Sequence, residues 1–167
     1  GSEFDLMTET GLYTVISALE GANLETVAPS MTQEIEEGKC SFNYAGNKAR
    51  NGGAIFLAGE GANVTLSGAG TFTNNAAVTA NGGAIFVNGG KAEVISDFTI
   101  ANGVYGVYIA DGEFVVADNA ALTISGGTTG IYAEGGKAVI STLNTSGLNY
   151  NINVNGESAD VTVNGGT

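Results

Sequence analysis

Asn51-Gly52-Gly53-Ala54-Ile55-Phe56 returns 30 residues later as Asn81-Gly82-Gly83-Ala84-Ile85-Phe86, and this repeated string indicates how the chain folds. Weaker copies, Gly106-Val107-Tyr108 and Gly130-Ile131-Tyr132, follow at steps of 22 and 24 residues, and Ile152 starts a last copy. A repeat of this length indicates one supersecondary unit that stacks on further copies of itself. The longer first step predicts an additional loop, within residues 75–81 or 58–62.

Each copy holds about three short apolar runs, which are rich in Val, Ile, Thr, Phe and Tyr and are separated by Gly, Asn or Asp. Such runs are typical of strands, and the residues between them are typical of turns. Three strands and three turns every ~22 residues predict an all-β chain that forms a right-handed parallel β-helix of about five coils over residues 41–167. A β-sandwich is the alternative, but it would not require equivalent residues at the spacing of one coil.

Stacking the copies gives columns of residues that can be sorted into inward and outward faces. In the first strand one parity is aliphatic throughout and should face the core, whereas the other parity should face outward. The third strand should form a further inward column, made of Phe72, Phe98, Leu122 and Leu143. The outward column of the first strand is aromatic, and it consists of Phe56, Phe86, Tyr108 and Tyr132. These rings either only stack on one another or form an exposed surface that binds a partner.

The composition excludes several classes of protein. Gly accounts for 27 of the 167 residues, but 43% are hydrophobic and only 13% are charged, which favours a packed core over disorder. With no His and a single Cys, the chain cannot carry a Ser-His-Asp triad, a His-ligated metal, an intrachain disulfide or a thiolate zinc site. Five basic residues against 17 acidic ones, a net charge of -12, make nucleic acid a poor partner.

The ends of the chain differ from the repeat. Residues 1–4 resemble a cloning scar and not a part of the fold. Residues 5–40 form an acidic lead-in or cap, in which a capping box at Ser30 predicts a short helix over residues 31–37. Residues 164–167 stop in the middle of the repeat pattern, so we interpret the sequence as an excised fragment.

The repeat resembles the paired FxxN and GGA motifs of the chlamydial polymorphic outer membrane proteins, in which Ile, Leu or Val follows the GGA. Tyr44-Ala45-Gly46-Asn47 precedes one GGAI string, with Tyr in place of Phe, and Phe72-Thr73-Asn74-Asn75 precedes the other. The resemblance covers residues 42–86, and from residue 104 onward no FxxN motif occurs.

The resemblance implies an autotransporter passenger, a β-helical stalk that is exported through a separate C-terminal barrel and mediates adhesion to host cells. The implied location is the bacterial cell surface, the outer membrane or the medium, and the implied partner is a host cell-surface protein or glycan. The resemblance also implicates the motif residues in adhesion, although their chemistry fits a purely structural role as well. The implicated residues are Tyr44, Asn47, Gly52, Gly53, Ala54, Ile55, Phe72, Asn75, Gly82, Gly83, Ala84 and Ile85.

β-Helices can also act on polysaccharides, bind carbohydrates or self-associate. A polysaccharide lyase would need a cluster of carboxylates for Ca²⁺ or acid–base chemistry, and the acids of residues 41–167 form no evident trio. Adventitious Ca²⁺ at Asp97, Asp111 or Asp118 lacks a supporting loop motif. We therefore expect no catalysis and no cofactor. The alternatives are a carbohydrate-binding or lyase-like module and a self-associating scaffold, since open solenoid ends expose strand edges.

Overall fold

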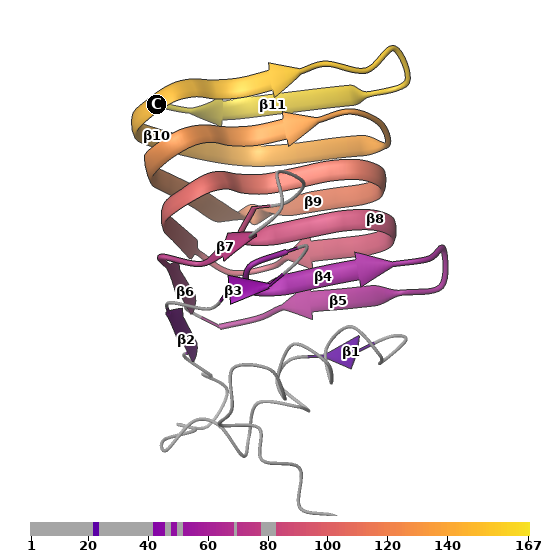
Figure 1. Ribbon diagram of the computed structural model, residues 1–167, viewed down its shortest axis with the longest axis horizontal. Coiled ribbons are helices and arrows are strands. Elements are labelled where there is room, and N and C mark those ends of the chain that lie inside the picture. The colour runs from indigo at the N-terminus through magenta and orange to yellow at the C-terminus, as the bar shows by residue number, and fades with distance from the viewer. Residues whose placement is uncertain (1–21, 24–41, 46–47, 50–51, 69, 78–82) are drawn as a thin grey trace, which may run out of the picture.

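The computed structural model describes residues 22–23, 42–45, 48–49, 52–68, 70–77 and 83–167 of the chain. These residues form a parallel β-solenoid whose coils stack one above the other (Figure 1). No helix occurs among them, and the helix expected over residues 31–37 and the scar over residues 1–4 lie outside this part of the chain. The strands are β1 Ala22–Asn23, β2 Phe42–Ala45, β3 Lys48–Ala49, β4 Ile55–Ala58, β5 Asn63–Leu66, β6 Gly70–Thr73, β7 Ala76–Ala77, β8 Ile85–Val94, β9 Phe98–Ala133, β10 Lys137–Val154 and β11 Asp160–Gly166.

The register of the first strand confirms the repeat steps of 30 and 22 residues. Ile55 pairs with Ile85, Ile85 pairs with Val107, and Ile152 pairs with Ile131 on the last coil. From Ile55 to Ile152 the chain therefore makes four turns, and the remaining residues continue along a further coil. Each of these pairings is parallel, which a β-sandwich joined by short turns could not produce.

The longer first coil contains two insertions, one in each of the expected loops. Between Thr73 and Ile85 the chain uses six residues more than between their partners Ala101 and Val107. The corner between β4 and β5 holds the other two additional residues. The larger insertion contains β7, which pairs with β3 in a small separate sheet, so the long corners of two successive coils stack on each other.

The third strand is in a different register from the one expected. Phe72 pairs with Ile100, and Phe98 lies opposite Gly70. The expected pairing of Phe72 with Phe98 is therefore wrong by two residues, although both rings are inward as expected. Because Gly70 has no side chain, Phe98 has room beside it, and the two Phe rings meet edge to face with centroids 4.7 Å apart.

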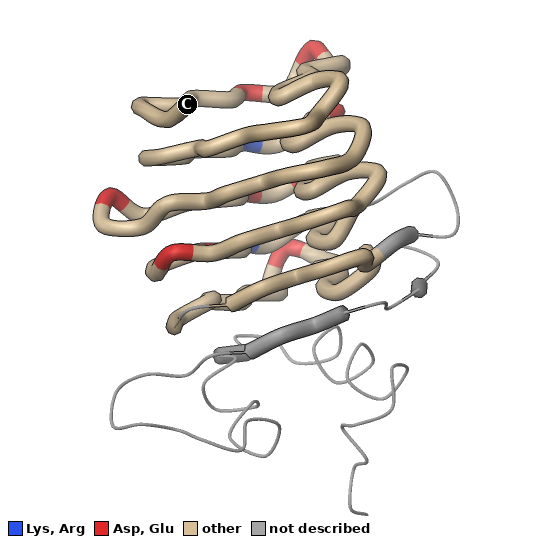
Figure 2. The backbone as a smooth tube through the Cα atoms, turned by 90° about the vertical axis from the view of Figure 1, so that its left-hand side faces the viewer, with Lys and Arg blue, Asp and Glu red and all other residues tan. Residues whose placement is uncertain are grey.

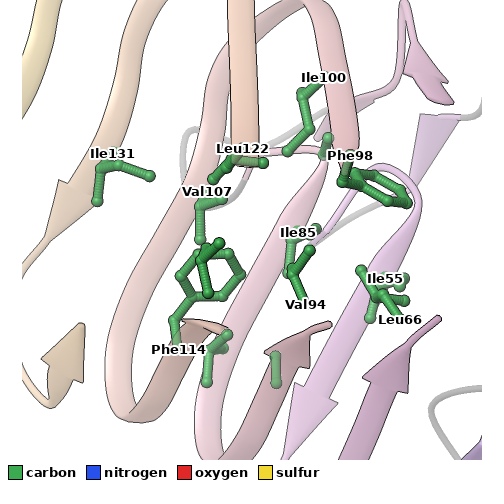
Figure 3. Close-up of a cluster of buried hydrophobic side chains, with 14 of the residues drawn as sticks. Ile55, Leu66, Ile85, Val94, Phe98, Ile100, Val107, Phe114, Leu122 and Ile131 are labelled. Carbon is green, nitrogen blue, oxygen red and sulfur yellow. The ribbon is translucent and has the colours of Figure 1, made fainter. Parts of the chain in front are cut away.

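The core is a continuous column of apolar side chains inside the solenoid. Figure 3 shows Ile85 beside Val94, and Val107 beside Phe114 and Leu122, inside the solenoid. All five of these side chains are fully buried. Stacked inward columns of this kind bury apolar area in every coil, so each coil depends on its neighbours for stability.

Glycine stands at a close approach of two coils just before the first strand. A Cβ on Gly106 would lie 2.7 Å from the carbonyl oxygen of Gly130, and one on Gly130 would lie 2.6 Å from the carbonyl oxygen of Asn151. A Cβ on Gly83 would likewise overlap the carbonyl oxygen of Tyr105. Close stacking therefore favours glycine at these three positions.

The outward edge of the second strand carries charges of alternating sign. Lys91 lies between Asn63 and Glu113 in the parallel register, and Lys137 lies between Glu113 and Asp160. Opposite charges on neighbouring strands favour this register, and like charges directly opposite would oppose it. Several acidic positions lie where the chain bends, as Figure 2 shows.

The sheet begins earlier than the boundary expected at residue 40. Ala22 and Asn23 form β1, which pairs in parallel with Val64 and Thr65 of β5. This short strand is the described part of the expected lead-in. It places these two residues beside β5.

Candidate functional site: an outward aromatic ridge

Five aromatic side chains form a continuous ridge across successive coils, here called the aromatic ridge: Phe56, Phe86, Tyr105, Tyr108 and Tyr132. Phe56, Phe86 and Tyr108 are paired in the parallel register of the first strand, so strand spacing places their rings in contact. The ring centroids of Phe56 and Phe86 are 5.0 Å apart, and the two rings are nearly parallel. Phe86 meets Tyr108 edge to face at 5.0 Å, and Tyr108 meets Tyr132 at 4.9 Å.

Tyr105 belongs to the ridge but was not expected there from the sequence. Its ring lies 5.5 Å from that of Tyr108 and 5.0 Å from that of Tyr132, so three Tyr rings form one cluster. The repeated string begins at Gly106, so Tyr105 lies one residue before the string and was not part of the aligned column. The signal that could have located it is the second Tyr three residues before Tyr108.

The ridge faces away from the core, as expected, but its middle is not exposed. Phe86 is 6% exposed and Tyr108 is 3% exposed, although neither belongs to the cluster of core side chains. The expectation that these two residues offer an exposed binding surface is therefore wrong. Neighbouring rings on both sides of each cover it, whereas Phe56 and Tyr132 are half-buried.

A carboxylate and an amide lie at one end of the ridge. The hydroxyl of Tyr132 donates a hydrogen bond to Glu134 Oε1 at 3.3 Å and accepts one from Asn155 Nδ2 at 3.0 Å. Burial, with the hydrogen bond and negative charge of Glu134, holds the pKa of Tyr108 well above its usual value. Burial also raises the pKa of Tyr132, while the hydrogen bond from Asn155 opposes the rise. Both phenols are therefore neutral hydrogen-bonding groups at physiological pH.

The two copies of the FxxN and GGAI motifs lie in register on adjacent coils. Tyr44 pairs with Phe72 and Ile55 pairs with Ile85, while the amide groups of Gly53 and Ala54 donate to the carbonyl oxygens of Gly83 and Ala84 at 2.6 and 2.8 Å. Asn47 and Gly82 lie outside the described residues. The stacking of the motifs is thus part of the coil-to-coil contact.

The motif side chains that the structure describes are buried, and this corrects the binding role that the resemblance implied for them. Phe72 and Ile85 belong to the core, and Asn75 is only 1% exposed. Gly52 has a φ of +61°, which favours glycine at this turn. A partner has no exposed side chain to contact at these positions, so their role is structural. The buried members are Gly52, Gly53, Ala54, Ile55, Phe72, Asn75, Gly83, Ala84 and Ile85.

The motifs also mark the coils that carry a long corner. Asn75 stands directly before β7, and the corner that β7 belongs to stacks on β3. Coils after residue 104 lack both the FxxN motif and the inserted corner. The fading of the motif along the sequence therefore reflects a change in the length of the coil.

Among the described residues no group of three His, Cys, Asp or Glu side chains is placed to hold a metal ion. Two of the Asp residues considered for Ca²⁺ act at turns. The carboxylate of Asp97 accepts a hydrogen bond from the amide of Ala121 at 2.9 Å, and that of Asp111 accepts one from Gly112 at 2.8 Å. Nor does this part of the chain contain a helix that is long and apolar enough to span a membrane.

Comparison of the chain with protein-family models, with curated proteins and with solved structures gave no match.

Proposed function

We propose that this chain is an extracellular adhesin module, part of the stalk of an autotransporter passenger that attaches a bacterium to host cells at the bacterial surface, and that it acts without catalysis. One observation carries the proposal: the aromatic ridge crosses several coils on the outside of the solenoid and ends on the half-buried Tyr132. Aromatic rings on a rigid support are effective contact residues because little conformational entropy is lost when they bind.

The solenoid supplies that support. The ridge residues Phe56, Phe86 and Tyr132 stand on strands whose opposite faces point into the core, so the position of each ring is fixed by packing. The two motif copies in register agree with the repeat of the family that the sequence resembles. They support the assignment through the architecture they build.

The test uses immobilised protein and measures how many cells of several host types it retains. The double variant Tyr105→Ala and Tyr132→Ala should reduce retention about tenfold or more, since both rings lie at the accessible end of the ridge. Val139→Ser is the matched control, because Val139 is half-buried and outward on the second strand. Retention of no cell type by the intact protein, or equal loss in the control, would contradict the proposal.

A second candidate is self-association through the last coil. Tyr150 is 57% exposed and Val154 is 49% exposed, and Ile152 is partly exposed although its register partner Ile131 is fully buried. These exposed apolar side chains lie close together near the end of β10, and exposed apolar surfaces often mark contacts between proteins. Sedimentation over a range of concentrations should show a dimer that Val154→Lys weakens, and a monomer at every concentration would refute this candidate.

A further inference from the structure

The aromatic ridge ends on Tyr132, and a small polar residue takes the next position in the same column. Asn153 pairs with Tyr132 in the parallel register of the last coil, where earlier coils continue with a ring. Both ring contacts of Tyr132 come from the preceding coil, with Tyr105 at 5.0 Å and Tyr108 at 4.9 Å. Among the described residues, no further ring stacks on Tyr132 from the side of the last coil.

Polar groups surround this end of the ridge. Asn155 and Glu134 are exposed, and both are hydrogen-bonded to the Tyr132 hydroxyl at 3.0 and 3.3 Å. Each retains further capacity, because an amide group offers two N–H donors and a carbonyl acceptor, and a carboxylate accepts at both oxygens. Asn153 adds a second amide beside the ring.

From this arrangement we infer that the Tyr132 end of the ridge is a binding site for an uncharged hexose unit of a glycan, an inference that rests on the proposed adhesive function. The apolar face of a pyranose ring packs on an aromatic ring, and its hydroxyl groups exchange hydrogen bonds with amide and carboxylate groups at the rim. Ligand sites in general combine an aromatic surface with a few polar groups that fix orientation.

The negative charge near Tyr132 favours neutral sugars over acidic ones. The carboxylate of Glu134 lies at the rim, and the chain as a whole carries a net charge of -12. An acidic sugar such as a sialic acid would bring a like charge to Glu134, so it would be disfavoured. Neutral and N-acetylated hexoses carry no such penalty, and their hydroxyl groups can donate to the same carboxylate.

The test is a binding assay of the whole chain on arrayed oligosaccharides that end in glucose, galactose, N-acetylglucosamine or sialic acid, followed by titration of the best neutral sugar. Neutral sugars should bind, and their sialylated forms should bind about tenfold or more weakly. Tyr132→Ala should lower the affinity for the neutral sugar about tenfold or more, and Asn155→Ala should lower it several-fold. The control Val139→Ser should leave the affinity unchanged.

Three results overturn the inference: absence of binding to every neutral sugar, stronger binding of the sialylated forms, or equal binding by Tyr132→Ala once circular dichroism has shown that the variant is folded. Tyr132→Phe keeps the ring and removes the hydroxyl, so it should retain more affinity than Tyr132→Ala, and the reverse order would also count against the site. If the intact chain retains cells but binds no neutral sugar, adhesion stands and the hexose site fails. If it binds the sugar but retains no cells, the hexose site stands and the adhesive function fails.

Discussion

Gly106→Ala tests how closely the coils must stack. The added Cβ would lie 2.7 Å from the carbonyl oxygen of Gly130 and 2.8 Å from a methyl carbon of Ile124. Since ordinary contact begins near 3.4 Å, the Cβ would have to move away from the backbone oxygen by about 0.7 Å. The Ile124 side chain can change its rotamer, but the Gly130 carbonyl belongs to the next coil and can move only if that coil moves.

The magnitude follows from the two opposing effects of the added methyl group. Overpacking of a close contact costs about 1–3 kcal/mol of the free energy of unfolding. Replacing Gly by Ala also removes freedom from the unfolded chain, which offsets about 0.4–1 kcal/mol. The expected net destabilisation is about 1–2 kcal/mol, which lowers the midpoint of urea unfolding by roughly 0.5–1 M for a slope near 2 kcal/mol per molar.

The assay is urea unfolding followed by far-ultraviolet circular dichroism and by tyrosine fluorescence, since the chain contains no Trp. Gly165→Ala is the control, because its Cβ would lie 3.5 Å from the nearest atom, the carbonyl oxygen of Ser141. The control should unfold at the same urea concentration as the parent chain or slightly higher. A Gly106→Ala variant as stable as the parent would refute the argument that stacking demands glycine here.

Three further predictions concern single side chains. Ser67 is buried, and its hydroxyl has no hydrogen-bond partner among the described residues. Ser67→Ala should therefore leave the free energy of unfolding unchanged or raise it by up to about 1 kcal/mol, and a clear decrease in the urea midpoint would contradict this. Burial and a neighbouring carboxylate raise the pKa of Tyr108, so the stability it contributes is complete below the unfolded pKa near 10 and is lost as the pH rises through the folded pKa. Thermal stability should therefore fall above about pH 10, and it should fall less in Tyr108→Phe; equal losses in both proteins would oppose this. Lys137→Glu would place a third acid between Glu113 and Asp160 and should lower the free energy of unfolding by roughly 0.2–1 kcal/mol at low salt and by less at high salt. Adding Glu113→Lys should restore part of the loss, and a loss that salt does not change would argue against the charge alternation.

Much of the fold could be predicted because the repeated strings show which residues of neighbouring coils pair. The GGAI strings are identical in two coils, so Ile55 and Ile85 could be paired from the sequence alone, and the weaker copies extended the same column to Val107. The third strand had no such string. A slip of two residues keeps every side chain on the same face, so the inward pattern alone could not tell whether Phe72 pairs with Phe98 or Ile100.

The candidate site was harder to predict because it depends on contacts between coils. Alternation along a strand showed that Phe86 and Tyr108 point outward, but it could not show that adjacent rings cover them. Tyr105 joins the ridge from outside the repeated string, and the hydrogen bond from Asn155 to Tyr132 joins residues 23 positions apart. Sequence alignment of the copies contains no information on either contact.

The parallel register of the coils has a mechanical consequence for a rod that is pulled at its ends. Backbone hydrogen bonds between coils run nearly along the solenoid axis, because the strands run across it. A force along the axis therefore loads the bonds of one coil boundary at a time and peels the end coil first, instead of shearing all ladders together. A coil of 22 residues, such as the one from Ile85 to Val107, releases roughly 70 Å of extended chain when it opens. Such a rod would lengthen in steps under load while the remaining coils stay folded, which limits the force that reaches whatever is bound at its surface.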